Sequence, residues 1–285
     1  MSASAVTGQR RHIWLCADDY GISNSVNAGI RELIMRGRIN ATSVMVAAPH
    51  FDRADAASLS MLNAATARAA IGLHVTLTGP FKPLSKGFQP LTAGGAFPSL
   101  SQLLRASLLG KLHHEALVIE IAMQLRAFVT AFGQPPDFID GHQHVQLFPQ
   151  IRDAVFKIVT EVAPKAWVRQ CGRVTPLYQR LGDAKGLFLD ILSAGFRSRA
   201  RKLGVRTNPA FAGTYSFSPD ADFPKLFHGF LQQMPEGGLI MCHPGFVDAE
   251  LRRLDPLTTL REKEFAYLNG EKFPGMLAAQ GVRLG

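Results

Sequence analysis

The stretch Ile13-Trp14-Leu15-Cys16-Ala17 is an apolar run that ends at Asp18-Asp19-Tyr20-Gly21. An apolar run without polar alternation is typical of a parallel strand that is buried on both faces. The two carboxylates come at the end of this run, and the glycine that follows frees the backbone for a sharp turn. The same combination, a buried strand that ends in ionisable groups, recurs along the chain and decides the fold.

Further apolar runs alternate with longer, helix-like segments. Strands are expected in residues 42–47, 71–77, 138–139, 166–168 and 239–242, and helices in residues 23–37, 51–70, 100–132, 148–162 and 258–268. Buried strands separated by helices indicate a parallel sheet covered by helices, and an α/β barrel or a doubly wound open sheet would fit equally well. No glycine-rich nucleotide-binding or phosphate-binding loop follows the first run, which counts against a nucleotide enzyme.

The composition indicates a globular protein with a sizeable core, because 47% of the 285 residues are hydrophobic and 19% are charged. We expect a flexible N-terminus over residues 1–11 and a single barrel domain over residues 12–285. We find no secretory signal, and no apolar stretch approaches the ~18–20 residues that a membrane helix needs. Three cysteines predict no disulfide framework, so a cytoplasmic location is the simplest interpretation.

The net charge of +9 is concentrated in one region, where nine Lys and Arg residues stand against two Asp residues between Arg169 and Arg206. The densest part is the stretch 197–206. A solvated helix face is the first interpretation, and a position near the mouth of a pocket that favours an anionic or polymeric substrate is the second. No zinc finger, aromatic ribonucleoprotein motif or helix-turn-helix pattern accompanies these charges, so no specific nucleic-acid partner is expected.

Ionisable side chains recur at or near the C-terminal ends of the expected strands, where α/β folds place their sites. They are Asp18, Asp19, His74, Asp140, His142, His144, Arg169 and His243. Each of them alone has an ordinary explanation, such as a turn, a helix cap or a hydrogen-bonded core histidine. Their recurrence has no such explanation and points to a functional site.

The segment Asp140-Gly141-His142-Gln143-His144 places three ionisable residues at the same parity, so an extended chain would project all three on one side. One Asp and two His make a mixed oxygen and nitrogen site with open positions, which suits a divalent cation that holds water and substrate. Such a cation polarises a carbonyl, while a nearby carboxylate acts as base and a separate histidine protonates a leaving amine. This pattern predicts amide hydrolysis without a covalent intermediate.

The sequence gives less support to a mechanism with a serine or cysteine nucleophile. The sequence contains no Gly-x-Ser-x-Gly elbow, and Cys16 and Cys242 lie inside apolar runs and are expected in the core.

Several short motifs follow one another in a specific order and spacing. They are 17–21 (ADDYG) with 27–30 (NAGI), 41–45 (ATSVM), 71–74 (IGLH), 139–144 (IDGHQH), 241–245 (MCHPG), and 255–257 (DPL) with Arg261, Glu262, Glu264 and Phe265. Together they resemble the YdjC-like carbohydrate deacetylases, the family that includes chitooligosaccharide deacetylase and the hopanoid-biosynthesis-associated deacetylases. The resemblance covers about residues 12–284. Gln146, where the family often has a histidine, and Tyr20, where phenylalanine is usual, depart from the pattern and would alter the pocket wall.

The resemblance implies an incomplete TIM-like (β/α) barrel with mostly parallel strands and outer helices. It implies a metal-dependent hydrolase that removes the acetyl group from an N-acetylated saccharide or a sugar-lipid. By matching motif, the metal ligands would be Asp19, His74 and His142, the general base Asp18 and the general acid His243. Asp140, His144 and Arg169 would support them, with Arg169 holding Asp18. One divalent metal ion, Mg²⁺ or Zn²⁺ first, and a homodimer are further expectations.

Two other functions remain open. One is a catalytically silent carbohydrate-binding or regulatory protein on the same barrel. The other is a metal-dependent hydrolase of another bond, such as a phosphate ester, although the two-metal sites common there usually need more carboxylates than these motifs supply.

Overall fold

The structure, a computed structural model, describes residues 10–65, 69–174 and 184–284. Its centre is a seven-stranded sheet with the strand order β6-β5-β4-β3-β2-β8-β7, in which every pair of neighbours is parallel. The strands are β2 (Trp14–Tyr20), β3 (Ala41–Val44), β4 (Ala70–Val75), β5 (Phe138–Gly141), β6 (Trp167–Val168), β7 (Phe211–Ala212) and β8 (Leu239–Cys242). If β6 and β7, the two ends of this order, are taken as neighbours, the strands follow one another around a circle in the order of the chain. This is the arrangement of a barrel that is open between β6 and β7.

The two edges of the sheet also approach each other. A parallel bridge joins Val168 of β6 to Thr207, just before β7, and the Val168 N–H donates to the Arg206 carbonyl at 2.9 Å. A doubly wound open sheet would instead reverse its strand order about a central strand. The expected incomplete (β/α) barrel is therefore confirmed.

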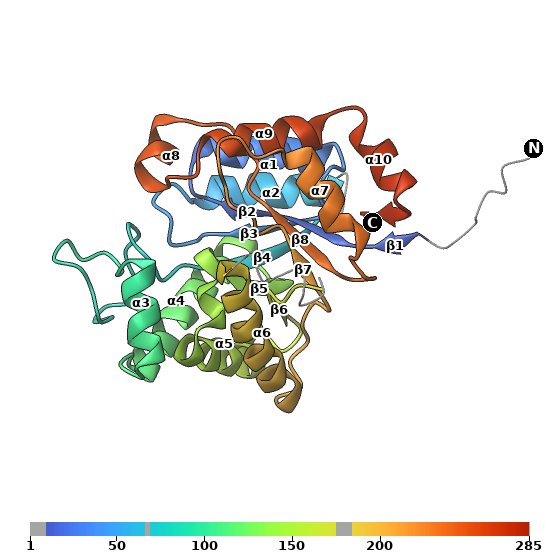
Figure 1. Cartoon of the computed structure of the whole chain (residues 1–285). Coiled ribbons are helices and arrows are strands. Elements are labelled where there is room, and N and C mark those ends of the chain that lie inside the picture. The colour runs from blue at the N-terminus through green and yellow to red at the C-terminus, as the bar shows by residue number, and fades with distance from the viewer. Residues whose placement is uncertain (1–9, 66–68, 175–183, 285) are drawn as a thin grey trace, which may run out of the picture.

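Helices surround the strands, as Figure 1 shows, with α1, α2 and α9 on one side of the sheet and α3 to α6 on the other. The helices are α1 (Asn24–Met35), α2 (Arg53–Ala65), α3 (Leu100–Leu108), α4 (His114–Phe132), α5 (Pro149–Val162), α6 (Ala184–Lys202), α7 (Phe223–Gln232), α8 (Ala249–Leu254), α9 (Thr259–Asn269) and α10 (Phe273–Ala279), with a 3₁₀ helix, η1 (His142–Leu147). None of those described has the length and apolar character needed to cross a bilayer.

The helix expected over residues 100–132 is wrong as a single element, because the chain turns between α3 and α4. Gly110 adopts a left-handed φ of 68°, which ends a helix at little steric cost. The N–H of Leu112 then donates to Gln150 Oε1 at 2.9 Å, and Gln150 Nε2 donates back to the Leu112 carbonyl at 2.7 Å. This exchange ties the turn to α5, a tertiary contact that helical periodicity does not reveal.

A close contact between neighbouring strands explains one glycine in the core. A Cβ atom on Gly72 of β4 would come within 2.3 Å of the ring of Phe138 on β5. That ring is buried and stacks on Trp167 with centroids 4.5 Å apart. A side chain at position 72 would therefore displace the aromatic pair that packs β5 against β6.

The N-terminal boundary differs slightly from expectation. Residues 1–9, most of the expected flexible segment, lie outside the described residues. Arg11, which we placed in that segment, lies instead in β1 (Arg11–His12) and pairs with β9 (Val282–Arg283) near the other end of the chain. The proposal that residues 12–285 form one domain stays a prediction.

Candidate active site

A bulge at the end of β2 brings two adjacent carboxylates into the same site. Ala17 pairs with Thr42 and Tyr20 with Val44, so Asp18 and Asp19 together oppose one residue of β3. Adjacent residues of a regular strand point to opposite faces, whereas an extra residue in the strand re-aims them. The left-handed φ of 70° at Asp19 marks this change of direction.

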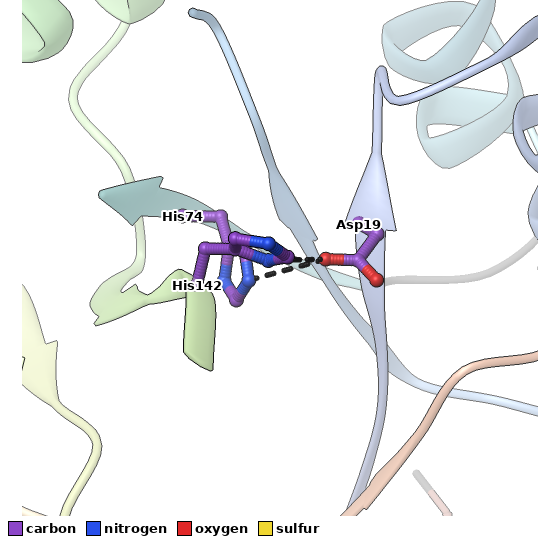
Figure 2. A group of neighbouring side chains, drawn as sticks. All are labelled: Asp19, His74 and His142. Carbon is purple, nitrogen blue, oxygen red and sulfur yellow. Dashed lines mark hydrogen bonds and ion pairs between the residues drawn. The ribbon is translucent and has the colours of Figure 1, made fainter. Parts of the chain in front are cut away.

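Three side chains from three strand ends meet at one carboxylate oxygen. Oδ1 of Asp19 lies 3.1 Å from Nδ1 of His142 and 3.4 Å from Nε2 of His74. One ligand atom from each of these buried residues lies within 4.8 Å of the others. Figure 2 shows both rings directed at this oxygen, while Oδ2 of Asp19 is turned away. The structure thus brings together the three expected ligands, and their metal-binding role stays a prediction.

The orientation of His74 is fixed by its other ring nitrogen. Nδ1 lies 2.6 Å from Oδ1 of Asp140 and 3.0 Å from Oγ of Ser43, which leaves Nε2 facing Asp19. Burial lowers the pKa of His74, but the Asp140 carboxylate outweighs it and raises that pKa to about 10. A carboxylate behind a ligating imidazole is a common arrangement in metal sites, and Asp140 occupies that place here.

Arg169 holds Asp18 from behind. Its guanidinium is fully buried and makes two bonds to the carboxylate of Asp18, of 2.6 and 2.7 Å, and a third ion-pair contact of 2.6 Å to Asp140. Burial raises the pKa of Asp18, but the Arg169 charge more than offsets it and holds that pKa well below its usual range. Asp18 is therefore ionised at neutral pH.

A second cluster of possible ligand atoms lies beside the first. Cys16, Asp18 and Asp140 could share a cation by their spacing. The guanidinium of Arg169 already lies among them, with Nη2 3.0 Å from the Cys16 sulfur. Arg169 therefore already supplies a positive charge to this cluster, and we assign no metal ion to it.

His243 follows β8 and faces the same side of the barrel. Its Nδ1 is buried without a hydrogen-bond partner among the described residues, and its ring contacts that of Phe217, with centroids 5.6 Å apart. Ala17 of β2 pairs with Cys242 of β8, so Asp18 and His243 directly follow paired residues of neighbouring strands. The histidine and the carboxylate therefore stand at one site.

His144 departs from the expected arrangement. β5 ends at Gly141, and Gln143 and His144 both adopt left-handed φ values, of 56° and 61°, so the extended segment that we predicted is wrong. The ring of His144 lies against Phe211, and its Nδ1 is 3.6 Å from the sulfur of Cys171. Burial lowers the pKa of His144 to about 3, which keeps the imidazole neutral. Its supporting role stays a prediction.

Two residues of α9, for which the sequence predicted no role, also contact the site. Nη2 of Arg261 donates to Oδ2 of Asp19 at 2.6 Å, and Glu264 accepts the backbone N–H of His243 at 2.5 Å. Both side chains are fully buried. Both stand in the last of the motifs that carry the family resemblance, and their spacing of three positions puts them on one face of a helix. That spacing could not identify the partners, which lie elsewhere in the chain.

The two departures from the family pattern have structural partners. The hydroxyl of Tyr20 donates to the Asp55 carbonyl at 2.9 Å and accepts from Arg31 at 2.9 Å, so it faces α1 and α2. Nε2 of Gln146 donates to the Arg169 carbonyl at 3.2 Å. Gln146 thus braces the strand end that carries Arg169.

The basic stretch 197–206 is tied to neighbouring elements of the barrel. Nη1 of Arg197 donates to Gln170 Oε1 at 2.9 Å, and Nε of Arg199 lies 3.4 Å from a carboxylate oxygen of Asp153 on α5. A contact of this stretch with substrate stays a prediction.

The chain is similar in sequence to a family of known proteins. The model of a family described as YdjC-like protein matches residues 12–279. A chitooligosaccharide deacetylase of Serratia marcescens is 30% identical over 246 residues, which cover 82% of each chain. A chitooligosaccharide deacetylase of Escherichia fergusonii is 27% identical over 271 residues, which cover 94% of this chain and 95% of the relative.

One solved structure shares the fold over nearly the whole chain. It is a candidate cellobiose-phosphate cleavage protein of Enterococcus faecalis V583, with a TM-score of 0.73, 20% sequence identity and 97% of both chains covered. The resemblance noted in the sequence is confirmed by these matches.

Proposed function

Because the chain belongs to the YdjC-like protein family, we propose that it is a metal-dependent carbohydrate deacetylase that removes the acetyl group from an N-acetylated saccharide. The observation that carries the proposal is the convergence of Asp19, His74 and His142 on one point beside an ionised Asp18. Relatives named chitooligosaccharide deacetylase favour short oligomers of N-acetylated sugars as the first substrates to test.

The donor set fits a divalent cation. Two imidazole nitrogens and one carboxylate oxygen form a mixed site of the kind that Zn²⁺, Co²⁺ and similar ions accept, and Mg²⁺ remains a second candidate. When bound, the cation polarises the acetyl carbonyl and makes water more acidic. His74 has one nitrogen engaged by Asp140, so its other nitrogen is the one available to the ion.

The remaining steps belong to the protein's own groups. Asp18 accepts the proton of the attacking water as the new C–O bond forms at the acetyl carbon. Arg169 keeps Asp18 ionised and fixes both of its oxygens. His243 gives a proton to the sugar nitrogen as the C–N bond breaks, which releases acetate and a free amine. Glu264 holds the backbone of His243 in place for this transfer.

The three cysteines are free and buried in the described part of the chain, which favours action in a reducing compartment such as the cytoplasm.

The test is acetate release from a panel of chitooligosaccharides and N-acetylglucosamine by the cation-loaded protein. We expect release by the wild type, its loss after chelation, and its loss in Asp18→Asn with the metal content unchanged. Asp220→Asn, which alters an exposed carboxylate, is the matched control and should stay active. Saccharide binding without acetate release across the panel would instead support the silent carbohydrate-binding alternative.

A further inference from the structure

Asp19 is held at both of its carboxylate oxygens by different partners. Oδ1 faces the two histidines, at 3.1 and 3.4 Å, and Oδ2 lies 2.6 Å from Nη2 of Arg261. Figure 2 shows Oδ2 directed away from both rings. Asp19 is 1% exposed, so both oxygens are shielded from bulk solvent.

Arg261 cannot easily leave Oδ2. Its guanidinium is fully buried, its Nε donates to the Leu257 carbonyl at 2.9 Å, and its Nη2 also lies 2.9 Å from Oδ2 of Asp255. An arginine does not lose its proton inside a protein, and a charge-assisted bond to a carboxylate is among the stronger hydrogen bonds. If Oδ2 of Asp19 moved to another partner, the buried guanidinium of Arg261 would lose one of the two carboxylates that balance its charge.

A carboxylate can bind a metal ion through one oxygen or through both. If both oxygens of Asp19 bound, they would occupy a position that water or the acetyl oxygen needs, because catalytic sites of this kind keep a position open. The contact with Arg261 opposes that second bond.

We propose that Arg261 is a positioning residue that reserves Oδ2 of Asp19, so that this carboxylate offers only Oδ1 to the cation and leaves a coordination position for substrate. This inference rests on the proposed function, because it requires a cation at Asp19, His74 and His142.

The test compares wild type with Arg261→Gln, loaded with Co²⁺. Without the guanidinium, Asp19 is free to bind through both oxygens. We expect the dissociation constant for Co²⁺ to stay within about threefold of wild type or to tighten, and kcat to fall at least tenfold. The visible absorption of bound Co²⁺ should weaken, as it does when coordination number rises. Arg36→Gln, which breaks an ion pair with Glu271 at the surface, is the control and should change none of these.

Other outcomes would overturn the proposal. If Co²⁺ affinity falls in parallel with kcat while the spectrum of the remaining complex is unchanged, Arg261 only keeps the ligand in place. Arg261→Lys retains the charge but loses the Nε bond to the Leu257 carbonyl that fixes the head group, and it should share the spectral change in part. If neither variant folds, a crystal structure of the cation-loaded wild type decides, since Asp19 bound through both oxygens refutes the inference. Failure of the wild type to bind Co²⁺ at all would refute the proposed function instead.

Discussion

Replacing Arg169 by methionine should damage stability and catalysis together, because one guanidinium contacts two buried carboxylates. Arg169 bonds both oxygens of Asp18 and lies 2.6 Å from Asp140. Methionine keeps much of the buried volume but leaves Asp18 without its guanidinium and Asp140 with His74 as its remaining cationic partner. Breaking a buried ion pair by removing one partner costs about 3–5 kcal/mol of unfolding free energy. Because Arg169 contacts two carboxylates, we expect a loss near the upper end of this range. For a large domain that is a fall in Tm of about 10–20 °C.

The pH dependence gives the same prediction a second readout. In the wild type the pKa of Asp18 lies below its usual range, so the stability that it contributes is present above pH ~4, near the unfolded-state pKa, and lost as pH falls. In the variant the guanidinium no longer opposes burial, so the pKa of Asp18 rises, and stability is retained at low pH and lost as pH rises. The difference in unfolding free energy between the two proteins should therefore be largest at neutral pH and shrink below pH ~4.

Urea unfolding of the metal-free proteins, followed by tryptophan fluorescence, measures the free energy, and the pH profile of kcat/KM measures the effect on the base. The acid limb of that profile should move to higher pH in Arg169→Met. Arg253→Met, which removes a surface arginine paired with Glu250, is the control and should cost less than about 1 kcal/mol. A loss of under about 1 kcal/mol in Arg169→Met, or an acid limb that does not move, would refute the reasoning.

Three further predictions follow from other contacts. Because the pKa of His74 is about 10, cation uptake at pH 8 should release about one proton, measured by titration calorimetry in two buffers, and no release would contradict the assignment. Gly72→Ala should lower the unfolding free energy by about 1–3 kcal/mol in urea, since its methyl group would meet Phe138, and an unchanged value would mean that the ring moves freely. Reversing the charges of Arg199 and Arg201 should raise KM for anionic oligosaccharides and flatten its salt dependence; if neither changes, the stretch is a solvated face.

The sequence predicted the strands that carry the site because each is a mostly apolar run with an ionisable residue inside it or directly after it. Residues 13–17 and 239–242 are apolar runs of this kind, and the neighbouring carboxyl ends of β2 and β8 bring Asp18 and His243 to one side of the barrel. β7 was missed because it lies between Pro209 and Gly213 in a stretch that the sequence marks as irregular, whereas the equally short β6 was expected.

What the sequence could not predict depends on local backbone geometry and on distant partners. The bulge that turns both Asp18 and Asp19 into the site, and the left-handed pair at Gln143 and His144, are set by tertiary contacts and not by residue periodicity. Arg261 lies 242 positions from Asp19, so only the folded chain reveals that the two side chains meet.

The central claim is that Asp19, His74 and His142 hold one cation. The most direct test is an anomalous difference map from a crystal of the Zn²⁺-loaded protein, recorded at the zinc absorption edge. We predict a single strong peak about 2.0–2.2 Å from Oδ1 of Asp19 and from one ring nitrogen of each histidine. A zinc peak elsewhere in the barrel, with no ion between these three side chains, would contradict the account.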